Sequence, residues 1–132
     1  MDIKQKILII DDSQIDLPVS ALLLKNKFQN AEIHMASSAS TGLDWLLAHS
    51  HELSQGLVIL LDVRMPEMDG FEFLKAYELL PEEIKSNTRI IMLSSTLDPH
   101  DIQKANSNKY VKTVLNKPLP VSDLVNILSE MQ

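Results

Sequence analysis

The sequence predicts an α/β fold, in which helices cover both faces of a mostly parallel β-sheet. Short aliphatic runs recur along the chain, and each is followed by a longer stretch with apolar residues at helical spacing. This alternation of strand and helix occurs five times, which is typical of right-handed βαβ crossovers. The most apolar run, residues 57–61, has no polar side chain, as expected for a strand that is buried on both faces.

The first strand and helix are expected near the start of the chain. Residues 6–10 form a buried strand that ends before two acids, Asp11 and Asp12. The helix that follows should begin near residues 15–17, because Pro18 is tolerated only in the first turn of a helix. Its expected apolar contacts come from five side chains, namely Leu17, Ala21, Leu22, Leu24 and Phe28.

A second strand and helix follow with weaker signals. Residues 31–36 alternate in polarity, which indicates a short and more exposed strand. Hydroxyl side chains within residues 37–40 can cap the next helix. The apolar face of that helix is expected to comprise Leu43, Leu46 and Leu47, and residues 49–55 are expected to form a loop.

The central strand is expected over residues 57–61, and the chain places a carboxylate, Asp62, directly after it. Pro66 and Gly70 favour a loop rather than a longer strand. Apolar residues at helical spacing then predict a helix from Gly70, which should end before Pro81. The expected result is a buried parallel strand that presents an acid at its carboxyl end.

The third buried strand is expected over residues 89–93, and it ends in three hydroxyl side chains at residues 94–96. Asp98 and Pro99 then suit the N-cap and the first position of a helix.

A last strand over residues 110–115 and a last helix over residues 121–130 complete the pattern. Carboxyl ends of parallel strands meet at one edge of a sheet, which is where ligands bind in open α/β sheets. The polar residues expected to converge there are Asp11, Asp12, Asp62, Ser94 and Lys117.

Length and composition favour one globular domain. The chain has 132 residues, and its formal charge of −6 argues against a surface that binds nucleic acid. No apolar run approaches the ~20 residues of a membrane helix, so we expect no membrane partner. The chain has no cysteine, which excludes disulfides and thiolate metal sites, and a cytoplasmic location is the default expectation.

Three carboxylates at one edge repel one another. At ~5 Å and an effective dielectric constant of ~20, each pair costs about 3 kcal/mol. The acids must therefore lie farther apart, hold a proton or bind a cation, and an all-oxygen set suits Mg²⁺. With Mg²⁺ and Lys117 beside it, Asp62 is a plausible nucleophile toward phosphorus, and Ser94 could bind a phosphoryl oxygen. The product would be an aspartyl phosphate.

These residues match the pattern of a known family. The matching set comprises Asp11-Asp12, Asp62, Met65-Pro66, Gly70, Ser94-Ser95 and Lys117-Pro118. On this set the chain resembles the receiver domain of bacterial two-component response regulators (CheY-like). The resemblance implies a flavodoxin-like, doubly wound (βα)5 fold whose five parallel strands lie in the order 2-1-3-4-5. It also implies that residues 1–132 are a single, stand-alone receiver domain.

The resemblance further implies a magnesium site. Asp62 and Asp12 would bind Mg²⁺ directly, and Asp11 would act mostly through water. The main-chain carbonyl of Arg64 would be a further ligand, while the Arg64 side chain is expected to be exposed and unused. Individually, Asp11 and Asp12 could instead cap the first helix and complement its dipole.

The same resemblance implies the phosphoryl chemistry. Asp62 would be the phospho-acceptor, and Ser94 and Lys117 would bind the phosphoryl group. The peptide bond between Lys117 and Pro118 would be cis. The donor would be a histidine kinase or a histidine phosphotransfer protein, and the phosphorylated chain would bind an unknown downstream protein through its last two helices and last strand.

One departure concerns how the signal would leave the site. Val114 occupies the position where many receivers have an aromatic residue that changes rotamer. Because Val114 has no ring to move, the switch is expected to rely on backbone movement of residues 94–98 and the next helix.

Two other functions stay open at this point. A small phosphohydrolase that forms an aspartyl phosphate would use a second acid two residues after Asp62, where this chain has Arg64. A pseudo-receiver would bind partners without phosphorylation, which the complete set of acids, hydroxyl and lysine argues against. The leading prediction is a signalling module that catalyses only its own phosphorylation and dephosphorylation, not a turnover enzyme.

Overall fold

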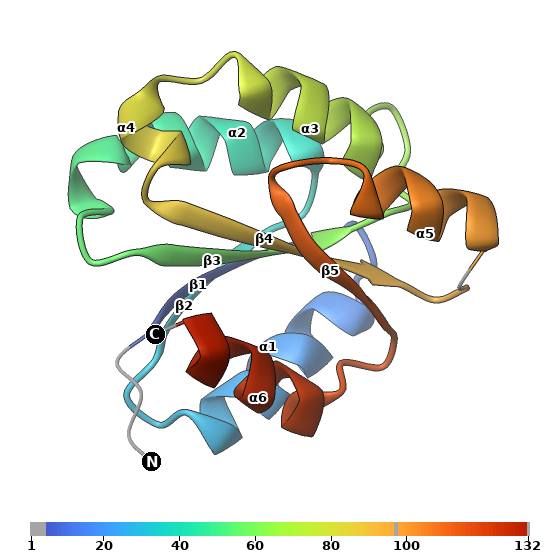
Figure 1. Ribbon diagram of the computed structural model, residues 1–132. Helices are drawn as coiled ribbons and strands as arrows, with labels where there is room; N and C mark the ends of the chain where they lie inside the picture. The colour runs from blue at the N-terminus through green and yellow to red at the C-terminus, as the bar shows by residue number, and fades with distance from the viewer. Residues whose placement is uncertain (1–4, 97, 132) are drawn as a thin grey trace.

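The computed structural model describes residues 5–96 and 98–131 and consists of a parallel sheet between two layers of helices (Figure 1). The sheet has the strand order β2-β1-β3-β4-β5, so the predicted α/β class and strand order are confirmed. The strands are β1 (Lys6–Ile10), β2 (Glu32–Ala36), β3 (Leu57–Asp62), β4 (Thr88–Ser94) and β5 (Val111–Asn116).

The helices lie on both faces of the sheet (Figure 1). They are α1 (Asp16–Lys27), α2 (Ala39–Ala48), α3 (Gly70–Glu78), α4 (Glu82–Lys85), α5 (Pro99–Asn106) and α6 (Val121–Met131). A short 3₁₀ turn, η1 (Ser50–Glu52), follows α2. In the described part of the chain, no helix is both long enough and apolar enough to span a lipid bilayer.

Two hydrophobic cores hold the layers together, one on each face of the sheet. Successive side chains of a strand point to opposite faces, so β1 contributes to both cores. Leu8 and Ile10 pack toward α2 and α3, whereas Ile7 and Ile9 pack toward α1 and α6. This double burial explains why the central strands are continuous apolar runs in the sequence.

Several boundaries differ from the sequence-based expectations. The helix expected to continue to Pro81 ends at Glu78, and the one-turn helix α4 follows the proline. The predicted loop over residues 49–55 contains η1. Strand β5 begins at Val111, and its pairing with β4 shifts by one residue between Ile90 and Ile91. Single turns such as α4 and η1 are too short to produce a helical pattern in the sequence.

Two leucines that were expected to make core contacts are exposed instead. Leu22 of α1 is 61% exposed and Leu47 of α2 is 51% exposed. Helix α1 is apolar on more than one side, so its pattern does not reveal which side faces the sheet. Ile15, Val19 and Leu22, spaced by four and three residues, form an exposed apolar stripe along α1.

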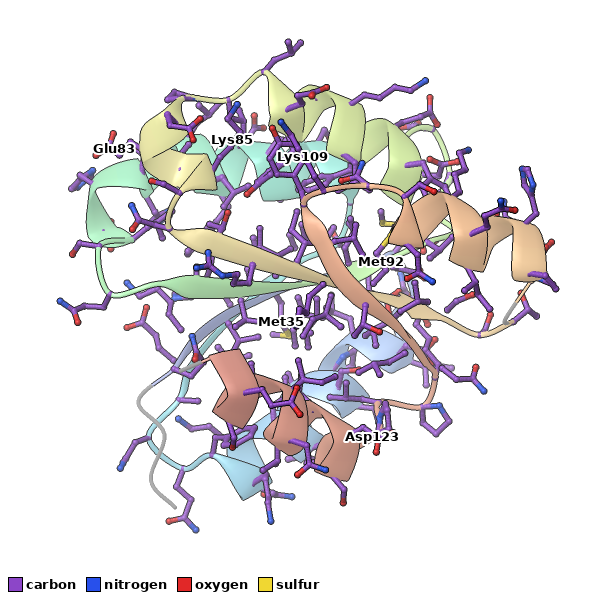
Figure 2. The ribbon with its side chains drawn as sticks, in the orientation of Figure 1. Met35, Glu83, Lys85, Met92, Lys109 and Asp123 are labelled. Carbon is purple, nitrogen blue, oxygen red and sulfur yellow. The ribbon has the colours of Figure 1, made fainter. Side chains whose placement is uncertain are left out.

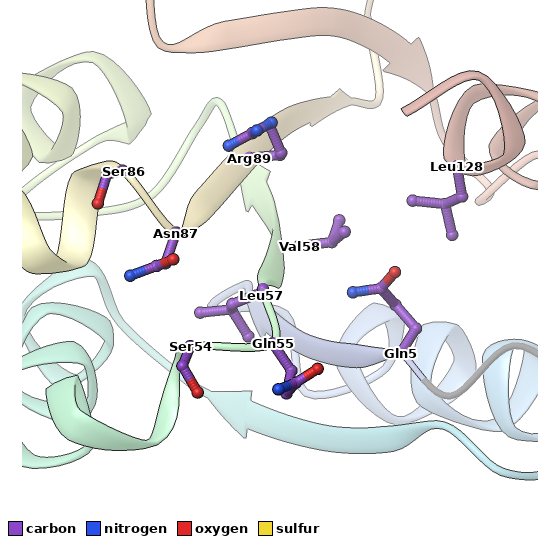
Figure 3. Close-up of a pocket in the computed structure, with 10 residues that line it drawn as sticks. Gln5, Ser54, Gln55, Leu57, Val58, Ser86, Asn87, Arg89 and Leu128 are labelled. Atoms are coloured by element: carbon purple, nitrogen blue, oxygen red, sulfur yellow. The ribbon is translucent and has the colours of Figure 1, made fainter. Parts of the chain in front are cut away.

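Polar side chains of both charge signs lie at the amino ends of the strands, where Lys6 of β1 is paired with Glu32 of β2. A hollow of about 320 Å³ lies at this edge (Figure 3). Its lining comprises Gln5, Ser54, Gln55, Gly56, Leu57, Val58, Ser86, Asn87, Arg89 and Leu128. On the same side of the molecule, Lys85 and Lys109 both approach the ring of Tyr110 (Figure 2). The three acids singled out from the sequence lie at the opposite edge of the sheet.

Candidate functional site

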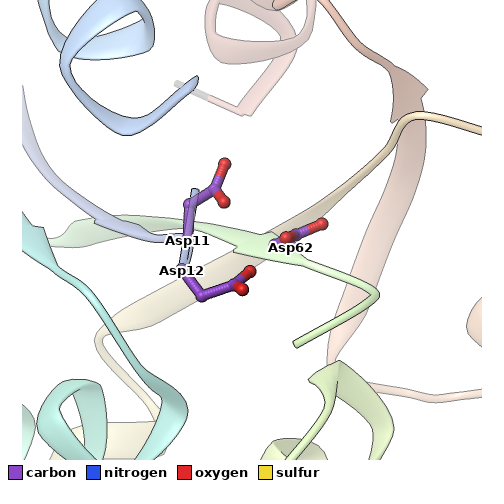
Figure 4. Close-up of side chains that lie close together, drawn as sticks. All are labelled: Asp11, Asp12 and Asp62. Atoms are coloured by element: carbon purple, nitrogen blue, oxygen red, sulfur yellow. The ribbon is translucent and has the colours of Figure 1, made fainter. Parts of the chain in front are cut away.

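The carboxyl edge of the sheet brings Asp11, Asp12 and Asp62 together. Strand pairing places Ile10 opposite Leu61, so the residues that follow, Asp11 and Asp62, are neighbours at this edge. One oxygen from each of the three carboxylates lies within 4.8 Å of the others (Figure 4). Of the alternatives expected from the sequence, a wider spacing of the acids is excluded, because the three carboxylates form one cluster.

Burial separates the three acids into two classes. Asp11 is 1% exposed and Asp62 is 6% exposed, whereas Asp12 is open to solvent. Two buried carboxylates side by side require a counter-charge, a proton or a cation. The exposed Asp12 leaves the cluster accessible from solvent.

Lys117 supplies the counter-charge from the end of β5. Its Nζ atom lies 2.7 Å from Asp11 Oδ2 and 3.4 Å from Asp62 Oδ1. Its main-chain N–H donates to the carbonyl of Ser94 over 2.8 Å, which fixes the chain next to β4. The predicted cis peptide bond between Lys117 and Pro118 is confirmed.

A fourth acid, Asp16, joins this network and was not identified from the sequence. Lys117 Nζ lies 3.2 Å from Asp16 Oδ2, in the first turn of α1. The Ser13 hydroxyl accepts from the main-chain N–H of Asp16, which sets the path of the chain from β1 into α1. Nothing in the sequence marks the contact of Asp16 with a residue 101 positions later.

Without a cation, the electrostatics of the cluster keep Asp62 protonated up to about pH 7. Burial, followed by the charge of Asp11, raises the pKa of Asp62 to about 7 against the attraction of Lys117. Burial alone would lower the pKa of Lys117, but the hydrogen bond to Asp11 and the charges of Asp62 and Asp11 raise it. Lys117 therefore stays charged at neutral pH.

The geometry of the carboxylates suits a small, hard cation. Ligand oxygens bound at ~2.1 Å to one Mg²⁺ lie about 3 Å apart when adjacent and about 4 Å apart when opposite. A spacing of at most 4.8 Å is within a small side-chain movement of that arrangement. Asp11 already has two partners, since Oδ1 accepts from Ser13 N–H and Oδ2 from Lys117. Asp12, which is exposed, and Asp62, which is buried, are thus the acids with more capacity for a cation.

Ser94 is buried at the end of β4, but its hydroxyl bonds within its own loop. The hydroxyl donates to the carbonyl of Thr96 and accepts from the N–H of Thr96 over 3.2 Å. The structure thus places Ser94 at the predicted edge, and within the described residues its hydroxyl bonds to Thr96 rather than to the acids. Within the predicted moving segment, residues 94–98, Leu97 lies outside the described residues.

Arg64 departs from its expected role. Its side chain is 59% exposed, as predicted, but it is used, because the guanidinium forms an ion pair with Asp101 of α5. The main-chain N–H of Arg64 also lies 3.4 Å from Asp62 Oδ1. Sequence reasoning missed the pair because Arg64 and Asp101 are 37 positions apart and on different elements.

Gly70 allows α3 to begin directly against the end of β3. A Cβ atom at this position would lie 2.6 Å from the carbonyl oxygen of Asp62 and 2.8 Å from Met92 Cε. Asp69 caps the helix and forms a reciprocal capping box with Glu72. The loop from Asp62 to Asp69 is therefore short and held at both ends.

Comparisons with known proteins identify similarity to regulatory proteins. A family model described as the response regulator receiver domain matches residues 7–129. The two-component response regulator ORR1 of Oryza sativa subsp. japonica is 30% identical over 122 residues, which cover 90% of this chain and 52% of that protein. The chain thus spans about half the length of this rice regulator. The probable methanogenesis regulatory protein FilR2 of Methanothrix harundinacea is 28% identical, and the match covers 96% of this chain and 80% of FilR2.

Solved structures show the same relationship. A response regulator receiver protein from Dyadobacter fermentans superposes with a TM-score of 0.81 at 34% identity, and the match covers 96% of both chains. A two-component response regulator from Cytophaga hutchinsonii has a TM-score of 0.86 and the same coverage of both chains. At 24% identity, the second similarity supports the fold alone.

Proposed function

The chain belongs to the response regulator receiver domain family, and on this premise we propose that it accepts a phosphoryl group on Asp62 in a two-component pathway. One observation carries the proposal. Asp62 ends the central strand as a buried carboxylate, with the Lys117 ammonium 3.4 Å from one of its oxygens and two more acids beside it. Such a cluster costs folding energy, which is typical of a site kept for chemistry.

The proposed reaction transfers a phosphoryl group from a phosphorylated histidine of a donor protein. A carboxylate oxygen of Asp62 attacks the phosphorus, and a P–O bond forms as the P–N bond to the imidazole breaks. The imidazole keeps the electron pair of the broken bond and takes up a proton. Little covalent help is needed, because catalysis of this reaction consists mainly of positioning and charge neutralisation.

The residues around Asp62 supply this positioning in the proposal. Lys117 can follow the oxygen of Asp62 onto the phosphoryl group, and Ser94 can donate to a phosphoryl oxygen after releasing the carbonyl of Thr96. Asp12 and Asp62, with the main-chain carbonyl of Arg64, would hold Mg²⁺. When bound there, Mg²⁺ would neutralise negative charge on the transferred group.

Asp11 has an indirect role in this proposal. Both of its oxygens already have protein partners, which supports contact with the metal through water rather than directly. Asp11 also holds Lys117 at 2.7 Å, so it keeps the ammonium oriented toward the acceptor.

The proposed donor is a histidine kinase or a histidine phosphotransfer protein, and the proposed location is the cytoplasm. Similarity to regions of plant histidine kinases, such as histidine kinase 3 of Arabidopsis thaliana at 37% identity over 86 residues, supports a kinase-type partner. The stripe of Ile15, Val19 and Leu22 lies on the helix that follows Asp12, so an apolar donor surface there would be next to the acceptor. The downstream partner, the output face on α5, β5 and α6, and stand-alone operation stay predictions.

The direct test is intact mass after incubation with acetyl phosphate and Mg²⁺. Wild type should gain one phosphoryl group, Asp62→Asn should gain none, and a control with an exposed acid changed, Asp44→Asn, should behave as wild type. Equal gain by Asp62→Asn would place the acceptor elsewhere. Steady release of phosphate from a small ester would favour a phosphohydrolase, and no gain from either acetyl phosphate or a kinase would favour a pseudo-receiver.

A further inference from the structure

Arg64 connects the candidate site with helix α5 through two different parts of the same residue. Its main-chain N–H lies 3.4 Å from Asp62 Oδ1, at the beginning of the loop after β3. Its guanidinium forms an ion pair with Asp101, in the first turn of α5. A displacement of residue 64 would therefore change its contacts with both the Asp62 carboxylate and helix α5.

The buried carboxylate of Asp101 needs a partner, and Arg64 supplies it. Its side chain is 9% exposed, and a buried carboxylate is costly without a partner. Arginine can meet a carboxylate with two parallel hydrogen bonds, so it fixes orientation as well as distance. Since Arg64 is 59% exposed, the pair is open to water on one side and can rearrange at lower cost than a fully buried pair.

A second connection between the candidate site and the first turn of α5 runs through the loop after β4. The hydroxyl of Ser94 bonds to Thr96, in the loop that leads into the N-cap Asp98. Farther along the helix, Ala105 enters the core and Lys104 lies over the ring of Phe71. The later part of α5 is thus anchored on the core, while its beginning depends on contacts that lead back to the carboxyl edge of the sheet.

We propose that Arg64 is a positioning residue that couples the state of Asp62 to the position of α5 through the ion pair with Asp101. The inference rests on the proposed function, because it requires Asp62 to become an acyl phosphate. Formation of the acyl phosphate converts the carboxylate into a mixed anhydride, so the Asp62 oxygen that faces Arg64 N–H loses its negative charge and becomes a weaker acceptor. The loop at residue 64 then has a different preferred position, and the ion pair passes this difference to α5.

The experiment compares backbone amide shifts of the full chain before and after beryllofluoride and Mg²⁺, a phosphoryl mimic. In wild type, the amides of residues 100–106 should shift together with those near Asp62. In Asp101→Ala, the α5 shifts should fall at least two-fold, while mass gain with acetyl phosphate stays at the wild-type level. The control Gln103→Ala, an exposed change on the same helix, should keep the wild-type α5 shifts.

Arg64→Ala removes the same pair from its exposed side, so it tests the coupling even where Asp101→Ala fails to fold. It should lose the α5 shifts, and Arg64→Lys should restore part of them because the positive charge is kept. Full α5 shifts in Arg64→Ala or in folded Asp101→Ala would overturn the coupling while the proposed function stands. No mass gain in wild type with acetyl phosphate or a kinase would overturn the proposed function, and the coupling with it.

Discussion

Replacing Asp62 with asparagine should stabilise the protein when divalent cations are removed by a chelator. Asparagine has nearly the shape of a protonated aspartic acid but does not ionise. The pKa of Asp62 is about 7 in the folded chain, mainly because of burial and then the charge of Asp11, against an ordinary value of 3.8. One pKa unit corresponds to about 1.4 kcal/mol, so ionised Asp62 destabilises the fold by about 4 kcal/mol above pH 7.

The sign and the pH window follow from proton linkage. The unfolded chain releases the Asp62 proton near pH 4, whereas the folded chain keeps it until about pH 7. Between these values the folded state binds more protons, so wild-type stability falls as pH rises. Asp62→Asn escapes this loss, and its advantage should grow from about 2 kcal/mol at pH 5 to about 4 kcal/mol at pH 8.

Urea unfolding with chelator at pH 5, 6, 7 and 8 measures the difference. The control Asp44→Asn, at an exposed position of α2, should change stability by less than about 0.5 kcal/mol at each pH. Saturating Mg²⁺ should narrow the gap, because the cation binds the folded wild type and adds to its stability. The raised pKa of Asp62 would be contradicted if Asp62→Asn is less stable than wild type at pH 8 in chelator, or if its stability advantage shrinks as pH rises.

Three further changes test neighbouring contacts. Asp12→Ala should abolish mass gain with acetyl phosphate and leave the chelated protein at least as stable in urea; normal phosphorylation would remove Asp12 from the site. Lys117→Met should abolish phosphorylation and lower stability by about 3 kcal/mol, because buried Asp11 loses its partner; unchanged stability in urea would contradict the ion pair. Thr88→Val should leave the buried Tyr77 hydroxyl without its bond, lowering stability by about 1–2 kcal/mol with normal phosphorylation; a loss of phosphorylation would show that the effect reaches the site.

The sheet and the acid cluster could be predicted because both depend on local sequence. Strands buried on two faces must be apolar throughout, so residues 57–62 mark the central strand and its terminal carboxylate without knowledge of the fold. Parallel strands end at one edge, and that topology alone brings Asp11 beside Asp62. Side-chain contacts across the fold carry no such local signal. The pairs of Lys117 with Asp16 and of Arg64 with Asp101 depend on where whole helices lie, and no period in the sequence reports that.

The apolar pattern of helix α1 does not identify which of its faces is buried. Its apolar residues surround most of the helix, so the sequence supports more than one buried face. The structure buries Leu24 and leaves Leu22 in solvent, although both were expected to make core contacts. The sheet decides which of the two leucines is buried, because only one side of α1 can face β1 and β2.

The residues of β5 narrow the ways in which a signal can leave the site. Strand β5 contains no aromatic side chain, and Val114 is half-buried opposite Met92, with a β-branched side chain that is stiff at χ1. Tyr110, the nearest aromatic residue, precedes the strand and packs edge-on against Tyr77, 5.1 Å between ring centres, toward the amino end of the sheet. Strand β5 therefore offers no aromatic ring that could change rotamer beside the carboxyl edge of the sheet. Among the described residues, the Ser94 hydroxyl contacts Thr96 in the loop before α5, and Arg64 is paired with Asp101 in the first turn of α5. We predict that a signal would reach α5 through these contacts by movement of the backbone. Perturbing either one should change the response of α5 without changing the chemistry at Asp62.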